Sequence, residues 1–317
     1  MTGTVEQRRG GLLETLHPYS AALVEGETLR WSVGPDLASF WRSGCKAMQL
    51  LNSLEQLPPE LVSGLDDRDL ALGAASHSGQ AFHVERVQAL LDRLGLRAEQ
   101  LRCGAHSPMH EASARALLRV GERPTVLHNN CSGKHTFMLA ASVASGWPED
   151  YLPREHPLQQ RNLALLTDWM AFSPGVAVDG CGVPCFHAPL SAMARAFARY
   201  ATEMADSPDG LAGRIGWASH RHPEWMSGEG RLDLAVVRGA REPVTVKIGA
   251  EGLFLVAVPG RRWGIAVKVH TGNADGLAVA VRAVLDALAP GMFTPAEWPW
   301  AEVRNVVGRV VGERRAV

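Results

Sequence analysis

The chain has 317 residues, of which 46% are hydrophobic and 21% are charged. These proportions are typical of a globular protein, and the length suits one large α/β domain or two closely joined ones. With 32 basic and 33 acidic residues, the formal net charge is −1, so no overall field draws the chain to nucleic acid or to an anionic membrane. We therefore expect a small neutral or zwitterionic partner, and neither nucleic acid nor membrane.

The N-terminal twenty residues include arginines, but no apolar segment of the kind found in a secretion signal follows them. No later run reaches about 18 uninterrupted apolar residues. We therefore expect a cytoplasmic protein. Five cysteines are an odd number for a disulfide framework in such a chain, so we expect reduced thiols. They are Cys45, Cys103, Cys131, Cys181 and Cys185.

In chain order, apolar residues three and four apart predict helices, and short β-rich runs predict strands. The expected elements are a helix over 82–96, a strand over 125–128, a helix over 157–172, a strand over 175–179, a helix over 189–202, strands over 244–248, 253–258 and 263–270, and a helix over 275–288. Turn-length gaps separate the last three strands, so they predict an antiparallel meander that leads into a helix.

These elements predict a mixed α/β fold of the α+β class, in which an antiparallel sheet is flanked by helices and a mostly helical subdomain is attached. We expect the α/β part to be built from the N- and C-terminal segments. The helical subdomain is expected within about residues 80–205. No internal repeat and no long linker divides the chain.

Lysine is rare in this chain. Of the 32 basic residues only four are lysines, namely Lys46, Lys134, Lys247 and Lys268. An amine loses its proton when it is buried and then serves as a base or a metal ligand, which a guanidinium does not do. Each lysine position is therefore a candidate functional position.

Two lysines lie in motifs of serine acyl-transfer chemistry. Ser43 and Lys46 form a Ser-x-x-Lys motif, in which residues three apart share a helix face and a neutral amine takes the hydroxyl proton. Lys247 ends a predicted strand in Lys-Ile-Gly, the form of the Lys-x-Gly strand that faces the nucleophile in such enzymes. Ser76, before the helix at 82, offers a second hydroxyl, although serine is also favoured there as a helix cap.

The segment 128–135 reads HNNCSGKH. It fails as a phosphate loop because His128 stands where the first glycine is needed and His135 where Ser or Thr is needed. Cys131 and, fifty residues later, Cys181 each follow a predicted strand, and thiolates with nitrogen donors suit zinc. Without a Cys-x-x-Cys pair, these residues alone leave a metal site open.

Six segments taken together resemble a known family. They are RSGCK at 42–46, SHSG at 76–79, CGAHSP at 103–108, HNNCSGKH at 128–135, DGCGVPC at 179–185 and KIGAEG at 247–252. In this order they are similar to the thermolabile rhizobial-type L-asparaginases of the asparaginase II family. The resemblance implies hydrolysis of the L-asparagine side-chain amide by a single catalytic unit over 1–317, on a fold like that of serine β-lactamases and glutaminases.

The resemblance also implies roles for individual residues. Two Ser–Lys pairs are expected to be catalytic, Ser43 with Lys46 and Ser76 with Lys247. A Zn²⁺ ion is expected on Cys131, Lys134 and Cys181. The substrate pocket is expected to be lined by Arg42, Asn130, His135 and Asp179. In such a pocket a carboxylate holds the α-amino group of the amino acid and a guanidinium holds its α-carboxylate.

Several alternatives stay open. We favour Ser43 over Ser76 as nucleophile because Lys46 lies one turn away on the same helix, and Lys268 is the alternative to Lys247. A related Ser-x-x-Lys enzyme acting on glutamine, a β-lactam or a peptide is the second functional hypothesis. A zinc-stabilised binding protein without catalysis is the third. On base rates we expect a homodimer.

Overall fold

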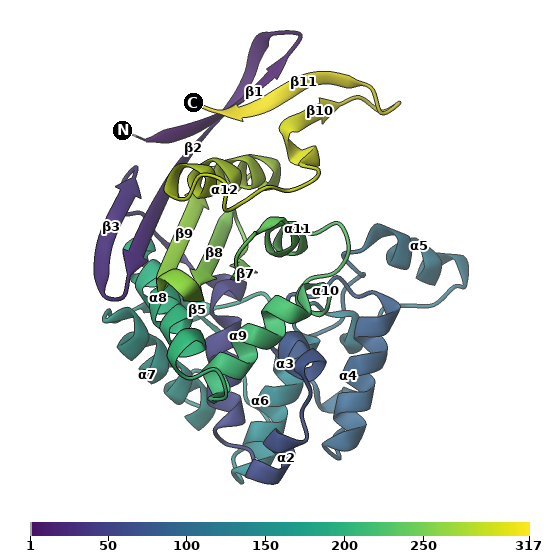
Figure 1. Ribbon diagram of the computed structural model, residues 1–317. Coiled ribbons are helices and arrows are strands. Elements are labelled where there is room, and N and C mark those ends of the chain that lie inside the picture. Colours follow the sequence, from purple (N-terminus) through teal and green to yellow (C-terminus); the bar gives the residue numbers. More distant parts are fainter. Residues whose placement is uncertain (1) are drawn as a thin grey trace.

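A computed structural model describes residues 2–317 as helices packed around a curled antiparallel sheet (Figure 1). The main sheet has eight strands in the order β10-β11-β1-β2-β9-β8-β7, and β3 pairs with β2 beside this path. Its strands are β1 Gly3–Arg9, β2 Leu12–Glu25, β3 Thr28–Val33, β7 Thr245–Ile248, β8 Leu253–Val258, β9 Trp263–Val269, β10 Glu302–Arg304 and β11 Val310–Ala316. The sheet therefore joins the two ends of the chain, with Val5 opposite Ala316.

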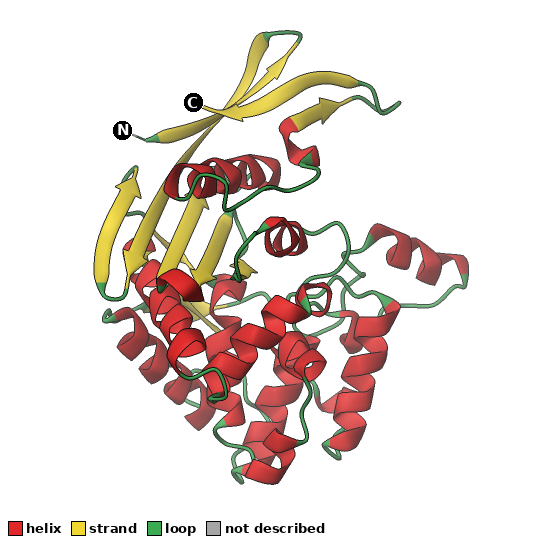
Figure 2. Cartoon of the chain, viewed as in Figure 1, coloured by secondary structure: helices red, strands yellow, loops and turns green. Residues whose placement is uncertain are grey.

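Most helices lie between these two groups of strands in the sequence, and the majority of them gather on one side of the sheet (Figure 2). The helices between the strands are α1 Lys46–Leu54, α2 Pro59–Ser63, α3 Asp67–Gly73, α4 Ala81–Arg93, α5 Glu111–Arg119, α6 Ser132–Ala144, α7 Pro157–Met170, α8 Leu190–Asp206, α9 Leu211–Arg221, α10 Pro223–Met226 and α11 Leu232–Gly239. The last of them, α11, packs on the other face. Helix α12, Ala274–Leu288, follows the meander. A small second sheet has the order β4-β6-β5, from Ala38–Phe40, Pro184–Pro189 and Gly175–Val178.

The main sheet separates two apolar cores. In β8, Leu253, Leu255 and Ala257 face the core shared with α1 and α8, whereas the alternate residues face the core shared with α12. This two-residue period is that of a strand buried on both faces. Helix α8 lies directly on β9 because Gly264 has no side chain there, since a Cβ atom would lie 2.0 Å from the Ala194 carbonyl oxygen.

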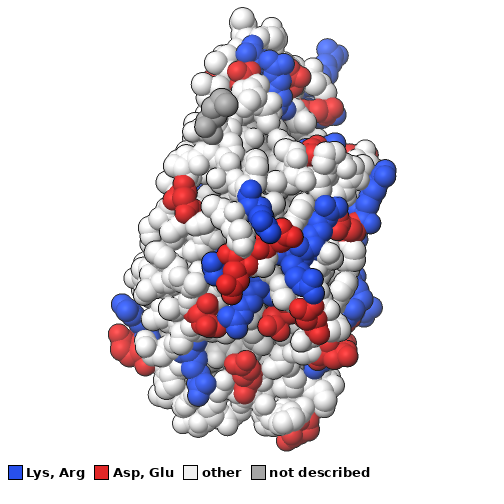
Figure 3. Space-filling model, turned by 60° about the vertical axis from the view of Figure 1, so that its left-hand side comes forward, with Lys and Arg blue, Asp and Glu red and all other residues white. Residues whose placement is uncertain are grey.

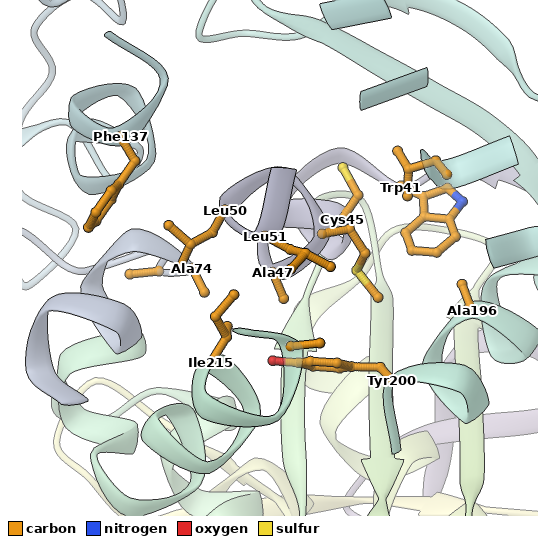
Figure 4. Close-up of a cluster of buried hydrophobic side chains, with 14 of the residues drawn as sticks. Trp41, Cys45, Ala47, Leu50, Leu51, Ala74, Phe137, Ala196, Tyr200 and Ile215 are labelled. Carbon is orange, nitrogen blue, oxygen red and sulfur yellow. The ribbon is translucent and has the colours of Figure 1, made fainter. Parts of the chain in front are cut away.

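Helix α1 runs through the middle of the larger core, and all nine of its residues are buried. Figure 4 shows the surrounding side chains, which include Trp41, Phe137, Tyr200 and Ile215. Because Lys46 is the first residue of this helix, the fold carries an amine into the interior of the protein.

The meander β7-β8-β9 and the helix after it confirm the sequence-based prediction, and β5, α4, α7, α8 and α12 lie within a few residues of their predicted ranges. The predicted strand at 125–128 is wrong, because Val126–His128 forms a 3-10 turn with the Thr125 hydroxyl at its start. Strands β1, β2 and β3 were not predicted. The glycine pair Gly10 and Gly11, both with positive φ, forms the turn between the first two.

The face of the molecule in Figure 3 carries charges of both signs side by side. Exposed ion pairs of the chain include those of Arg30 with Glu25 and of Arg262 with Asp206. No helix within residues 2–317 has both the length and the apolar character needed to cross a membrane. The arrangement agrees with the nearly neutral composition.

Candidate active site

A buried hydroxyl lies between two buried amines. The Nζ atoms of Lys46 and Lys247 each lie 2.9 Å from the Ser76 Oγ atom. Exposed fractions are 1% for Lys46, and 3% for Ser76 and for Lys247. The three residues come from α1, from the segment between α3 and α4, and from β7. The fold thus brings together residues that are 30 and 171 positions apart.

Ser76 lies in a stretch that is neither helix nor strand, yet residues 74–80 are all buried. A buried stretch of this kind needs partners for its backbone groups. The Ser76 N–H donates to the Met226 carbonyl at 3.0 Å, and the Ser78 carbonyl accepts from the His110 N–H at 2.9 Å. These contacts fix the position of the hydroxyl.

Lys46 donates to three acceptors, namely the Ala75 carbonyl at 2.7 Å, the Ser76 hydroxyl and the Asn130 carbonyl at 3.3 Å. Three acceptors match the three N–H donors of an ammonium group. The side chain therefore extends to Ser76, whereas the helical spacing predicts a contact with Ser43. Leaving the buried N–H donors of Lys46 unpaired would cost more free energy than forgoing one contact with Ser43. Ser43 is half-buried, and its hydroxyl has no hydrogen bond to any of residues 2–317.

Lys247 differs from Lys46 in having only two acceptors, the Ser76 hydroxyl and the Ile248 carbonyl at 3.1 Å. Burial lowers the pKa of Lys247 to about 7, with the Asp233 carboxylate opposing the shift and the Lys46 charge adding to it. An amine with this pKa exchanges a proton near neutral pH, as a general base must.

Lys268 lies elsewhere. Its Nζ atom donates to the Glu251 carbonyl in the turn between β7 and β8, where Glu251 has a φ of 55°. The structure therefore brings Lys247, and not Lys268, to Ser76.

Arg42 and Asp179 form an ion pair beside Ser43. Burial disfavours the charges of both, but their attraction raises the pKa of Arg42. Lys134, the Gly180 N–H and Arg42 together lower the pKa of Asp179. Arg42 has a φ of 48°, a left-handed conformation that costs on the order of 1–3 kcal/mol in a residue with a side chain and is concentrated at functional sites. Ser43 thus follows a strained residue that is held by a carboxylate.

The structure brings Cys131, Lys134 and Cys181 together. The Lys134 Nζ atom lies 3.3 Å from the Cys181 sulfur, and the Cys131 and Cys181 thiols are close enough to shift each other's pKa. The Cys181 thiol, helped by the Lys46 and Lys134 charges, holds the pKa of Cys131 well below its usual value. The same contact raises the pKa of Cys181.

Two converging sulfurs, one of them poised as a thiolate, and one amine are a donor set that fits zinc. Within residues 2–317, no three or more His, Cys, Asp or Glu side chains are grouped so that they could hold a metal. A metal at this place would therefore depend on the amine of Lys134 as its third protein ligand.

Asn130 and His135 lie on either side of this cluster in the sequence. The Asn130 N–H donates to His106 Nε2 at 2.9 Å, and its carbonyl accepts from Lys46. His135 is completely buried, with Nδ1 at 2.9 Å from the Tyr151 hydroxyl and with no described partner for Nε2. Burial lowers its pKa well below the usual value, so the ring is neutral at pH 7. A contact of His135 with substrate stays a prediction.

The polar character of HNNCSGKH follows from its contacts. The Asn129 amide donates to the Cys103 carbonyl at 2.9 Å, and its oxygen accepts from the Cys131 N–H at 2.8 Å. The Ser132 hydroxyl lies 2.8 Å from His77 Nε2. Gly133 lets α6 approach α3, since a Cβ atom would lie 2.3 Å from the Leu72 carbonyl oxygen. The segment therefore positions the site as well as supplying it.

Sequence reasoning missed three residues around the site, His77, His106 and Asp233. His77 and His106 lie within the SHSG and CGAHSP segments, so proximity to a motif was an available signal for them. Asp233 is completely buried near Lys247 and has no motif around it. Only the three-dimensional structure reveals it.

Comparisons with solved structures give distant likenesses. A crystal structure of Mglu in its native form in 4.3 M NaCl is 15% identical, with a TM-score of 0.44, over 84% of this chain and 59% of that chain. This chain thus spans about three fifths of Mglu. A putative beta-lactamase from Bacteroides dorei is 11% identical (TM-score 0.42; 84% and 93% covered). A simvastatin synthase mutant from Aspergillus terreus is 12% identical (TM-score 0.37; 90% of each chain covered).

No curated protein sequence matches the chain. A family model does: the one described as L-asparaginase II matches residues 5–316. This match covers all the motif segments and supports a hydrolase that acts on amides. The chain therefore belongs to the L-asparaginase II family.

Proposed function

We propose that the protein hydrolyses the side-chain amide of L-asparagine to L-aspartate and ammonia through a seryl acyl-enzyme. The observation that carries this proposal is the Ser76 hydroxyl held between the amines of Lys46 and Lys247. Such an arrangement moves protons for acyl transfer. Family membership supports an amide as the substrate.

The ion pair of Arg42 and Asp179 suits the two charged groups of an amino acid. The guanidinium would take the α-carboxylate and the Asp179 carboxylate would take the α-amino group. In the structure the two side chains satisfy each other. A zwitterion that bound between Arg42 and Asp179 would replace their one ion pair with two. The gain of an ion pair would favour free amino acids as substrates.

Ser43 is the proposed nucleophile. Its hydroxyl is partly exposed and directly follows Arg42, whereas Ser76 is enclosed. The Ser43 oxygen would bond to the amide carbon and give its proton to the Lys46–Ser76–Lys247 group. That group would return a proton to the leaving nitrogen as the carbon–nitrogen bond breaks, so ammonia departs. Water would then attack the ester, releasing L-aspartate and restoring the serine hydroxyl.

Cys131, Lys134 and Cys181 are the residues proposed to hold zinc. A zinc ion held there would supply positive charge that anchors and orients the substrate. The contact between Lys134 and Cys181 joins the start of α6 to the loop after β5, two residues beyond Asp179.

A homodimer in the cytoplasm stays a prediction. Light scattering on the purified protein would test the dimer, since the mass of one chain is 34.2 kDa. Fractionation of cells that produce the protein would test the location.

The test of the proposed function is ammonia release from L-asparagine and, in parallel, from L-glutamine. Glutamine is longer by one methylene, which a pocket distinguishes by about 1–3 kcal/mol. We expect turnover of asparagine with a higher kcat/KM than that of glutamine. A folded, zinc-loaded protein that releases ammonia from neither substrate would overturn the proposal and would favour the binding-protein hypothesis.

A further inference from the structure

Asp233 is a completely buried carboxylate that the proposed reaction does not yet use. It is the second residue of α11. Its Oδ1 atom accepts from the Ile248 N–H at 2.8 Å, and its Oδ2 atom has no hydrogen-bond partner among residues 2–317. Burying a charged oxygen without a full set of partners costs free energy. A contact or charge near Asp233 must therefore offset the cost of burying its carboxylate.

The position of Ile248 suggests one such contact. Strand β7 is an edge strand of the main sheet, and within the described chain it pairs only with β8. Its outward N–H groups have no neighbouring strand, and Asp233 provides the acceptor for the one at Ile248. The carbonyl of Ile248 in turn accepts from Lys247 Nζ at 3.1 Å. A continuous series of contacts thus links Asp233 through Ile248 and Lys247 to the Ser76 hydroxyl.

We propose that Asp233 is a positioning residue of this site, whose carboxylate fixes the edge of β7 at Ile248 and supplies the negative charge that balances the Lys247 amine. The inference deepens the proposed function and rests on it, because it concerns the reaction only if Lys247 moves a proton there. The helix N-terminus at which Asp233 lies favours a negative charge.

The charges around Lys247 set the sign of the expected effect. Burial lowers its pKa most, and the charges of Lys46 on α1 and of Arg231 just before α11 lower it further. Asp233 raises it, and so does Cys131 from the start of α6. Removing the Asp233 charge should therefore lower the pKa of Lys247, and removing the Arg231 charge should raise it.

The test uses Asp233→Asn, which keeps an oxygen for the Ile248 N–H and removes the charge. The pKa of Lys247 is read from the rate of acetylation by acetic anhydride at a series of pH values, with peptide mass spectrometry to identify the lysine. This measurement needs no turnover. We expect the pKa to fall by about one unit.

The kinetic counterpart is the pH profile of kcat/KM for L-asparagine. The acid limb should move to lower pH by the same amount, and kcat on the plateau should fall because a less basic amine is a weaker base. A purely structural role for Asp233 would reduce the amount of active protein without moving the limb. Arg231→Gln should move it the opposite way, and it serves as the second variant if Asp233→Asn does not fold.

The matched control is Asp69→Asn. Asp69 is also completely buried, but its carboxylate pairs with Arg86 and Arg93, so its loss should leave the pKa of Lys247 unchanged. If the wild type is active but the pKa of Lys247 is the same in Asp233→Asn, in Arg231→Gln and in the wild type, this inference alone is overturned. A wild type that is inactive on both amides would overturn the proposed function, and with it the catalytic role of Asp233.

Discussion

Lys134 and Lys247 are both buried in the same site, yet their pKa values move in opposite directions. Burial acts against the charge of each. At Lys134 the sulfurs of Cys181 and Cys131 and the carboxylate of Asp179 outweigh burial and raise the pKa. At Lys247 burial prevails over Asp233, and the pKa falls to about 7. At equal burial, the neighbouring charges decide whether a lysine keeps its proton or becomes a base, and Lys134 would bind zinc only by giving that proton up.

The two lysines belong to different centres. Lys247 forms a proton-transfer centre with Lys46 and Ser76, and Lys134 forms a sulfur centre with Cys131 and Cys181. Substitutions in the first should reduce turnover and leave metal content unchanged. Substitutions in the second should reduce metal content first.

The largest effect is expected for Ser43→Ala. Loss of the proposed nucleophile should reduce kcat for L-asparagine by about 1,000-fold or more. Because the Ser43 hydroxyl is half-buried and has no described hydrogen bond, the melting temperature should change little. Steady-state kinetics and thermal unfolding measure the two outcomes. Nearly normal kcat in a folded Ser43→Ala protein would rule out Ser43 as nucleophile.

Lys247→Met should reduce kcat by about 100- to 10,000-fold, the range of general acid–base catalysis. Lys247→Arg should not restore it, because a guanidinium keeps its proton at neutral pH. Zinc content, measured by elemental analysis, should equal that of the wild type. Rescue by arginine would show that only positive charge is needed at this position.

Cys131→Ser should remove bound zinc, with a loss of affinity of at least about 10- to 100-fold. Cys103→Ser is the matched control, since Cys103 is also buried but lies outside the proposed ligand set. Elemental analysis after dialysis gives the zinc content of each protein. Equal zinc in the two variants would contradict the assignment of the sulfur centre.

The pH dependence of stability should also report on Lys247. An unfolded lysine has a pKa of about 10.4, whereas burial lowers the folded value to about 7. Between these pH values the unfolded chain binds more protons, so this group makes stability rise with pH across that window. Urea unfolding at pH 7, 8.5 and about 10 should show a smaller rise in Lys247→Met than in the wild type. The same slope in both proteins would contradict the lowered pKa.

The smallest effect is expected for Lys268→Met. Lys268 contacts the Glu251 carbonyl and not the Ser76 hydroxyl, so the loss should be about one hydrogen bond, roughly 0.5–1.5 kcal/mol of stability. The kcat should change by less than about tenfold. A loss as large as that of Lys247→Met would give Lys268 the role assigned to Lys247.

Much of the fold could be predicted from the sequence where a local pattern is strong. The meander over β7, β8 and β9 has apolar strands and short turns, and it was predicted almost residue for residue. Strand β2 was missed because its first half is exposed and interrupted by Pro18, and its pairing with β1 and β11 depends on the far end of the chain. Long-range pairing leaves little local signal.

The residues of the site could be predicted from the sequence, but which side chains contact one another could not. Rare lysines and the family motifs identified Lys46, Ser76 and Lys247. Helical spacing suggested that Lys46 serves Ser43, but the structure turns its amine toward Ser76, because a buried ammonium needs three acceptors. Asp233 could not be found from sequence, since burial and its contact with Ile248 exist only in the folded chain.

The most direct test of the central claim is to trap the acyl-enzyme. Wild-type protein would be mixed with L-asparagine, quenched in acid within the first turnover, digested and examined by peptide mass spectrometry. We predict an aspartyl ester on the peptide that contains Ser43. An ester on the Ser76 peptide, or ammonia release without any ester, would contradict this account.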